Sequence, residues 1–200
     1  SFAVPLVSGA AALVWQAYPY FNNDLVRQTL LGTATDLGAA GVDPTFGYGL
    51  LNVGKAVLGP ARFDWGTVDV TVNTLRSTWA NDISGNGGLT KRGSGTLVLS
   101  STANTFAGDI QVLGGTLQTA SLQSARVGVA SGASLIGSGR IAGTLNNAGT
   151  VQVNGATLAV AGNYIQDSTG RLALNVGDRL NVTGTASIAG ELQLLGRRDY

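Results

Sequence analysis

A short unit, Gly-Thr-Leu, recurs through the second half of this chain. It begins at Gly95, Gly115 and Gly143, with looser copies at Gly149-Thr150-Val151 and Ala156-Thr157-Leu158. A spacing of about 20 residues, with some drift, is typical of the rungs of a β-solenoid. A single rung cannot bury its own apolar face, so a chain of this kind must be stabilised by stacking each rung on the next.

Aliphatic residues alternate with polar ones in short runs punctuated by Gly and Asn, which predicts strands. The residues expected to share a face are Val68, Val70 and Val72; Leu97 and Leu99; Ile110 and Val112; Val151 and Val153; and Leu172, Leu174 and Val176. Leu99 and Val112 are expected to point inward and Val98 outward. Low charge combined with this alternation argues against disorder. A β-sandwich remains an alternative, because alternation does not fix topology.

Composition changes near residue 60. All four prolines lie at or before Pro60, and a long proline-free segment suits continuous β-ladders, in which proline would remove a donor. We therefore expect two domains, 1–60 and 61–200, that meet at Gly59-Pro60. The strand repeats are clearest at 79–118.

The first domain is expected to be mostly helical. Residues 4–18 predict a helix of roughly 22 Å, ended by Pro19. Its side chains are apolar nearly all round, and a helix without a polar face must be buried on every side. Sixty residues cannot easily supply such layers, so we expect more of this domain to lie upstream.

Two further helices are expected in the same domain. One covers residues 24–31, with Asn22 or Asn23 as its N-cap and Gly32 as the residue just after its end. The other is short, begins after Asn52 and ends near Leu58.

Whole-chain counts exclude several kinds of chemistry. The 200 residues carry a formal charge of +1 and contain no cysteine and no histidine. A net charge this close to zero gives no sign of the basic surface that binds nucleic acid. The lack of cysteine excludes disulfides and thiolate metal sites. Without histidine, a Ser-His-Asp triad cannot be completed within these residues. We expect no cofactor and no metal. No signal peptide or membrane-spanning apolar run is evident.

The first nine residues, Ser-Phe-Ala-Val-Pro-Leu-Val-Ser-Gly, resemble the nucleophile segment of the subtilisin-like serine proteases. Every fixed position matches from the serine onward, and the Gly-Thr pair that precedes it in the family is absent because the chain begins at Ser1. The resemblance extends over residues 1–60, with Pro19, Asn22, Val26-Arg27, Gly47, Gly49, Leu51 and Asn52 at matching positions.

This resemblance implies a C-terminal fragment of an α/β subtilisin-like domain with Ser1 as the catalytic nucleophile. The serine would form an acyl-enzyme with protein or peptide substrates. The family's Asp, His and oxyanion-hole Asn lie upstream, so the fragment alone is expected to be inactive. The alternative for Ser1 is an ordinary helix N-cap. Asp24, Asp36 and Asp43 are interpreted as capping or loop residues, not as triad members.

A second resemblance covers Trp79 to Leu117. The segments Trp79–Gly85, Gly93–Ser100 and Val112–Leu117 closely resemble the passenger-associated strand repeat of bacterial autotransporters. That family implies a secreted or surface-displayed passenger of a Gram-negative bacterium, with a β-helix stem and a C-terminal β-barrel in the outer membrane. No barrel signature precedes Tyr200, so the chain is expected to stop within the stem.

Other signals are weaker. Residues 137–142, Gly-Ser-Gly-Arg-Ile-Ala, match a dinucleotide fingerprint, but no helical pattern follows them and the glycines fit repeat turns. A sugar could bind to the aromatic residues Phe63, Trp65 and Trp79, but we expect these residues to pack where the two domains meet. Besides a protease, the sequence allows a non-enzymatic surface or adhesion passenger with a degenerate protease domain, or a purely structural stem.

Overall fold

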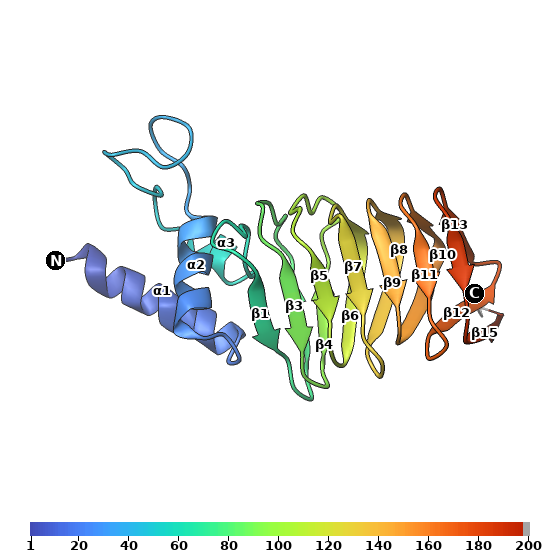
Figure 1. The fold of residues 1–200 in the computed structure, drawn as a ribbon. Coiled ribbons are helices and arrows are strands. Elements are labelled where there is room, and N and C mark those ends of the chain that lie inside the picture. The colour runs from blue at the N-terminus through green and yellow to red at the C-terminus, as the bar shows by residue number, and fades with distance from the viewer. Residues whose placement is uncertain (198–200) are drawn as a thin grey trace.

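A computed structural model describes residues 1–197. Three helices come first in the described chain, α1 (Ala3–Ala17), α2 (Asn23–Thr33) and α3 (Val53–Ala56). The strands follow: β1 (Val68–Thr71), β2 (Arg76–Trp79), β3 (Leu89–Arg92), β4 (Thr96–Leu99), β5 (Ile110–Val112), β6 (Thr116–Leu122), β7 (Arg126–Val129), β8 (Ser134–Ile141), β9 (Thr144–Asn147), β10 (Thr150–Val160), β11 (Tyr164–Gln166), β12 (Arg171–Val176), β13 (Arg179–Val182), β14 (Ala186–Ile188) and β15 (Glu191–Arg197). The helices cover one end of an elongated stack of strands (Figure 1).

The strands form a β-solenoid in which every ladder between named strands is parallel. One sheet has seven strands in the order β1-β3-β5-β7-β9-β11-β14. The other has eight, of which seven follow the order β15-β12-β10-β8-β6-β4-β2 and the eighth, β13, pairs with β10. The chain therefore alternates between the sheets and adds one strand to each per rung. β13 pairs with the second half of β10. The predicted solenoid is confirmed, and the β-sandwich is excluded because its sheets are antiparallel.

Stacking brings equivalent residues into columns inside the solenoid. Leu97 pairs with Leu117, which pairs with Leu135, which pairs with Val151, and all are buried. Gly143-Thr144-Leu145, in contrast, lies on β9 in the other sheet. The looser copy at Thr150 is thus the true structural equivalent of the copies at Gly95 and Gly115, and the motif at Gly143 is not.

Glycine at the repeat turn has a steric reason. A Cβ at Gly95 would lie 2.4 Å from the carbonyl oxygen of Leu75, and one at Gly115 would lie 2.3 Å from the carbonyl oxygen of Gly95. Both distances are too short for a real contact, so a side chain at either glycine would push the stacked turns apart.

The inward assignments are confirmed for Leu99 and Val112. Two face assignments need correction. Val98 points to the outer face but is only 7% exposed, because it lies in a groove that Gln118 and Ile136 also line. Val176 is 61% exposed instead of sharing the buried face of Leu172. The stem also begins earlier than Trp79, with β1.

Helices α2 and α3 begin where the sequence predicts, because their side-chain caps are present. The Asn22 side chain accepts a hydrogen bond from the Leu25 amide, and Asn52 accepts one from the Lys55 amide. The expectation for Gly32 is wrong: it lies inside α2, which continues to Thr33. A Cβ there would approach the Arg62 side chain at 3.1 Å, so tight packing is the reason for this glycine.

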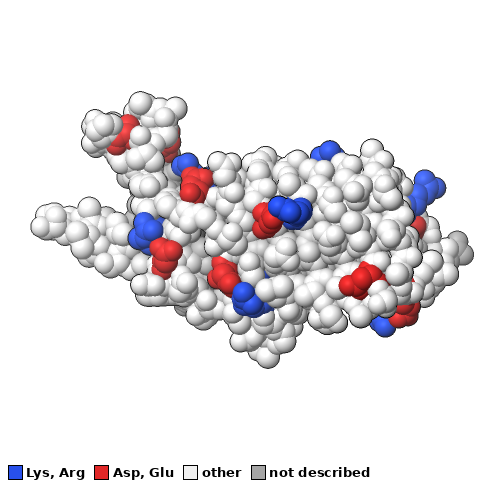
Figure 2. Space-filling view, viewed as in Figure 1, with Lys and Arg blue, Asp and Glu red and all other residues white. Residues whose placement is uncertain are grey.

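A single cluster of buried apolar residues runs from α1 through the rungs as far as Leu172. It crosses the predicted boundary at Gly59-Pro60 without a break, so the two predicted domains share a core. The outside of the stem carries few charges, and those visible in Figure 2 are scattered singly or in pairs of opposite sign. Within residues 1–197, none of the helices has the length and apolar character needed to cross a bilayer.

Candidate functional site

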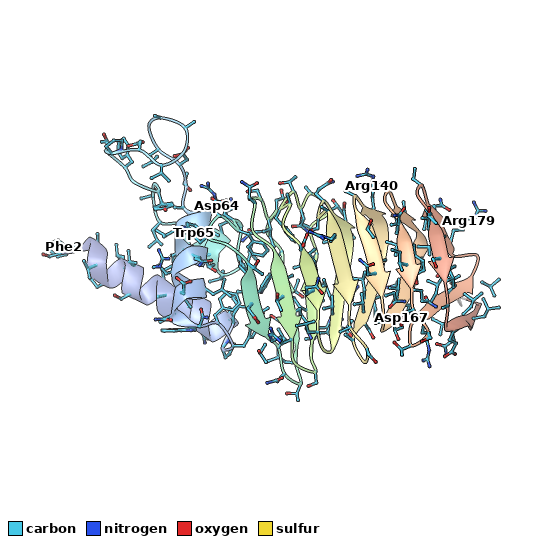
Figure 3. The ribbon with its side chains drawn as sticks, in the orientation of Figure 1. Phe2, Asp64, Trp65, Arg140, Asp167 and Arg179 are labelled. Carbon is cyan, nitrogen blue, oxygen red and sulfur yellow. The ribbon has the colours of Figure 1, made fainter. Side chains whose placement is uncertain are left out.

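Ser1 lies just before the first helix and is exposed to solvent. Phe2 occupies the N-cap position of α1, and its backbone has helical angles, without a side-chain cap. The alternative of Ser1 as an ordinary N-cap therefore does not match the structure. Phe2 is 94% exposed and projects from the free end of α1 (Figure 3). The Ser1 hydroxyl stands at the positive end of a 15-residue helix, where backbone N–H groups favour a developing negative charge.

Most of α1 is not covered within this chain. Ala10 and Val14 are buried, whereas Leu6 is 67% exposed. The other large exposed side chains of this helix are Val4, Val7, Leu13 and Trp15. Burial on all sides, expected from the sequence, is thus not found among these residues. A Cβ at Gly9 would meet nothing within 4 Å, so the space beside it is open as well.

The carboxylates near the helices have local roles, as the sequence indicated. Asp24 pairs with Arg27 at 3.0 Å on the exposed side of α2. Asp36 accepts a hydrogen bond from the Gly41 amide, and Asp43 accepts two from the amides of Thr45 and Phe46. Each of these contacts lies within its own turn or helix, and the Asp43 Oδ2 atom is buried without a hydrogen-bond partner among the described residues. None is placed to orient a base for Ser1.

Aromatic residues join the helices to the first rung. Phe63 and Trp79 are fully buried, so neither offers a surface to a sugar. Their rings lie edge to face, with centroids 6.3 Å apart. Trp65 is only partly buried, and its ring centroid lies 5.9 Å from that of Tyr48. The expectation that these residues pack where the two predicted domains meet is confirmed for Phe63 and Trp79.

Two tyrosines complete this joint. The Tyr18 hydroxyl can donate a hydrogen bond to either of two backbone carbonyls. Its oxygen lies 3.0 Å from the Val57 carbonyl oxygen and 3.1 Å from that of Thr78. The Tyr20 hydroxyl accepts a hydrogen bond from the Trp79 indole N–H at 3.0 Å. Burial raises the pKa of Tyr18 to about 12, and it raises the pKa of Tyr20 as well. Both phenols therefore stay neutral throughout the physiological range.

Inside the stem, one inward column carries polar side chains. Lys91, Val112, Val129, Asn147 and Gln166 pair in succession along the seven-stranded sheet. The Lys91 ammonium donates to three carbonyls, those of Gly93, Gly95 and Gly114. The column lies beside the turns between the sheets, so its polar members can satisfy turn carbonyls that face inward.

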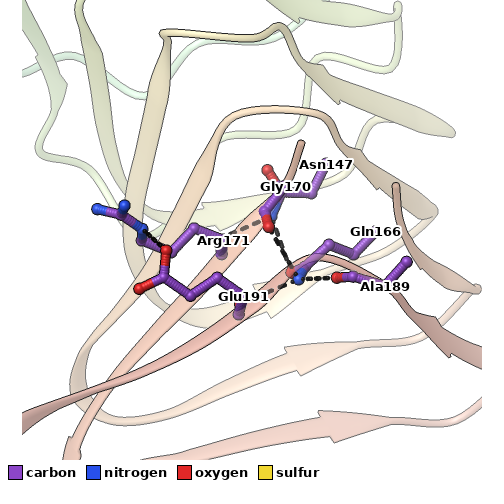
Figure 4. Close-up of polar contacts among 6 residues, drawn as sticks. All are labelled: Asn147, Gln166, Gly170, Arg171, Ala189 and Glu191. Atoms are coloured by element: carbon purple, nitrogen blue, oxygen red, sulfur yellow. Dashed lines mark hydrogen bonds and ion pairs between the residues drawn. The ribbon is translucent and has the colours of Figure 1, made fainter. Parts of the chain in front are cut away.

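Asn147 and Gln166 repeat this arrangement further along the stem (Figure 4). The Gln166 amide donates to the carbonyls of Gly170, Ala189 and Glu191. The Asn147 amide donates to the Arg171 carbonyl at 2.9 Å. Each side chain thus bonds its own turn, the next rung or both, and holds adjacent turns together. The sequence analysis missed these residues; a lysine in an inward position of the Leu89-Thr90-Lys91 alternation was the available signal.

The glycine-rich segment at 137–142 is a strand and not a phosphate loop. It forms the second half of β8, which ends at Ile141, and no helix follows it among the residues that the structure describes. Gly139 has φ of +77°, and a Cβ there would collide with the Ala120 carbonyl oxygen. Its glycine is therefore needed for the stacking of rungs.

Comparison with protein families divides the chain in the same way as its structure. Residues 1–49 match the Subtilase family, and residues 89–119 match the Passenger-associated-transport-repeat. The first match begins at Ser1 and covers α1 and α2. The second covers β3 to β6, the rungs that contain Lys91 and its carbonyl partners.

Three relatives match the chain over different shares of its length. The chain is 40% identical over 210 residues to the Neisserial autotransporter lipoprotein NalP of Neisseria meningitidis serogroup B, a match that covers 98% of the chain and 19% of the relative. An extracellular serine protease of Serratia marcescens is 33% identical over 177 residues, 70% of the chain and 17% of the relative. The adhesin BmaC autotransporter of Brucella suis biovar 1 is 35% identical over 143 residues, 69% of the chain and 4% of the relative. The chain thus spans less than a fifth of the length of these relatives.

Proposed function

The chain is a segment of a subtilisin-like autotransporter passenger, and from this premise we propose that the protein it comes from is a secreted or surface-displayed serine endopeptidase of a Gram-negative bacterium. The observation that carries the proposal is the match of residues 1–49 to the Subtilase family, which starts at Ser1. The similarity to an autotransporter and to an extracellular serine protease supports the secretion route.

In the proposed mechanism Ser1 is the nucleophile. A serine hydroxyl needs a base to accept its proton, and the chain contains no histidine. The base, the residue that orients it and the side-chain oxyanion donor are proposed to lie upstream of Ser1. Substrate binding would bring the scissile carbonyl to the start of α1, where the helix end stabilises the tetrahedral oxyanion. Protein or peptide substrates follow from this chemistry.

The exposed apolar surface of α1 fits this proposal. A helix with Phe2, Val4 and Leu6 exposed leaves a large apolar area in water, and such areas mark sites of contact with other protein. We assign this surface to the rest of the subtilase domain. The stem would then hold the protease away from the outer membrane and support folding of the passenger as it emerges, since each rung can stack on its neighbour without waiting for distant chain.

The test is replacement of this serine in the full-length parent protein. Ser1→Ala is expected to reduce turnover by about 10⁶-fold, the scale known for loss of the triad serine in subtilisin. Ser8→Ala is the matched control, because Ser8 lies on the same helix and donates only to the Val4 carbonyl. Near-normal turnover of Ser1→Ala would show that another residue is the nucleophile. The isolated 200 residues should show no peptidase activity sensitive to serine-directed inhibitors.

A second candidate function is adhesion without catalysis. It is favoured by the similarity to an adhesin autotransporter, which covers 69% of the chain. Adhesion of whole cells that display the Ser1→Ala parent would separate the two functions. If the protein is an adhesin, the Ser1→Ala variant keeps its full cell binding. In that case the unmodified parent also shows no peptidase activity.

A further inference from the structure

We propose that the first rung of the β-helix is a positioning element of the protease: β2, through Trp79, fixes the angle of α1 and thereby the place of Ser1. The inference rests on the proposed function for the role of Ser1. The connection between helix and rung rests on contacts within this chain alone.

The centre of this connection is a short chain of hydrogen bonds. The Trp79 indole N–H donates to the Tyr20 hydroxyl at 3.0 Å, and that hydroxyl lies 2.7 Å from the Ser77 hydroxyl. Trp79 is fully buried, Ser77 is buried and Tyr20 is partly buried. Buried polar groups require their partners, so the three side chains are held in one arrangement. Two of the three belong to β2 and the third to the turn that ends α1.

Tyr18 adds a second connection from the last turn of the same helix. Its hydroxyl reaches the Thr78 carbonyl on β2 and the Val57 carbonyl beside α3. Its backbone amide donates to the Val14 carbonyl and closes α1. A rotation or shift of α1 would therefore break a bond to the stem.

Aromatic packing leaves little freedom between these groups. The Phe21 ring stacks on Tyr18 with centroids 4.7 Å apart, and it meets Trp79 edge to face at 5.7 Å. The Trp15 indole N–H donates to the Phe21 carbonyl at 2.7 Å and ties the helix to the turn that follows it. Stacked and edge-to-face ring pairs attract each other beyond the effect of the area that they bury.

The rung also holds the helix that follows the subtilase-like segment. The side-chain amide of Asn81 donates to the backbone carbonyls of Lys55 and Gly59. The backbone N–H of Ala80 donates to the Leu58 carbonyl. The rung thus contacts the chain on both sides of the α2 segment. Both α1 and α3 are therefore packed against the first rung.

A helix converts a small tilt at one end into a displacement at the other. Fifteen residues rise about 22 Å, so a tilt of roughly 5° at the Trp79 joint moves the start of α1 by about 2 Å. A misplacement of about 1 Å at a reacting group can cost about 10²-fold in rate. A residue about 20 Å from Ser1 can therefore control its reactivity without touching substrate.

The experiment uses the full-length parent with Tyr20→Phe and Trp79→Phe. Tyr20→Phe keeps the ring and removes only the hydroxyl between Trp79 and Ser77, so it tests the joint even if Trp79→Phe folds poorly. Both variants are expected to lower kcat, and the rate of labelling by a small fluorophosphonate, by about tenfold or more, with KM unchanged within about twofold.

The matched control is Tyr164→Phe. Tyr164 is a fully buried phenol on β11, hydrogen-bonded to Asn147 and Gln166, and it lies several rungs from the joint. It should lower the unfolding midpoint without a change in kcat. Equal losses of kcat in Tyr164→Phe and Tyr20→Phe would mean that only stem stability matters. An unchanged kcat in Tyr20→Phe and Trp79→Phe would equally overturn the proposal.

A readout without activity separates this inference from the proposed function. Amide hydrogen exchange in the 200-residue chain should speed up in the second half of α1 in Tyr20→Phe, and not in Tyr164→Phe. If Ser1→Ala leaves the parent active, the proposed function fails. If exchange in α1 is the same in Tyr20→Phe and wild type, the joint itself fails.

Discussion

The helical segment and the stem both contain many apolar residues, yet they bury them in different ways. In α1 and at its N-cap, six large apolar side chains are exposed, namely Phe2, Val4, Leu6, Val7, Leu13 and Trp15. In the stem, inward columns such as Leu97, Leu117 and Leu135 are fully buried. A rung finds its partner in the neighbouring rung, whereas α1 needs surfaces that residues 1–60 do not supply. We therefore expect a segment to fold by itself only when the surfaces that bury its apolar side chains lie close to it in the sequence.

The two ends of the stem follow the same rule. At the first rung, helices and the ring of Phe21 cover Trp79, which is fully buried. At the last described rung, β15 pairs only with β12, and Leu194 is 68% exposed. Exposed leucine marks a rung that has a neighbour on one side only. The stacking of a further unit on this face would bury it.

The largest effect is expected when the two parts are separated. Residues 1–60 alone should show no cooperative thermal transition and should bind a hydrophobic dye, because α1 lacks its partners. Residues 61–200 alone should keep a cooperative transition, although Trp79 loses contacts. Circular dichroism during heating checks both. A sharp transition of isolated 1–60 would contradict the comparison.

Within the stem, a charge in an inward column should be the most damaging single change. Val112→Asp buries a carboxylate between Lys91 and Val129 and should cost about 4 kcal/mol or more in unfolding free energy. Gln111→Asp is the matched control on the adjacent, exposed position and should change it by less than about 0.5 kcal/mol. Urea denaturation of the 200-residue chain measures both. Similar losses in the two variants would show that the column does not face a closed core.

Val98→Thr should fall between these two. Its side chain is 7% exposed on the outer face, so we expect a loss of about 1 kcal/mol in unfolding free energy. The same denaturation experiment ranks it against Val112→Asp and Gln111→Asp.

Removal of the Lys91 ammonium tests the polar column. Lys91→Met keeps a long side chain but leaves the carbonyls of Gly93, Gly95 and Gly114 without this donor, which should cost about 1–3 kcal/mol. Lys55→Met, on the exposed helix α3, is a control that should be close to neutral. A neutral Lys91→Met would mean that water serves these carbonyls equally well.

Lys91 should also make the stability of the chain depend on pH. Burial lowers the pKa of Lys91 from 10.5 to about 8. Between these values the unfolded chain binds the proton and the folded chain releases it, so stability should rise with pH, by at most about 1.4 kcal/mol per unit. The raised pKa of Tyr18 and Tyr164 acts in the opposite sense above pH 10, where unfolded phenols ionise. The measurement therefore compares wild type with Lys91→Met between pH 8 and 10. Equal slopes in the two proteins would exclude Lys91 as the source.

The sequence by itself determined the local features of this protein. Alternating aliphatics predict strands because side chains of a strand point to opposite faces, and Asn22 and Asn52 predict helix starts because their side chains satisfy free amides. The repeat of about 20 residues predicts stacked rungs. The segment from Ser1 to Gly9 identifies the subtilase resemblance, although Ser1 as nucleophile stays a prediction.

Only the tertiary structure decided what depends on distant neighbours. The inward position of Lys91 becomes meaningful only once the turns at Gly93 and Gly114 stack around its ammonium. The joint between Tyr20 and Trp79 connects residues 59 positions apart. The close packing of Arg62 against Gly32 of α2 likewise joins two distant segments. A linear sequence gives periodicity and caps, but a contact between distant segments exists only after the chain has folded, because its energy depends on which surfaces come together.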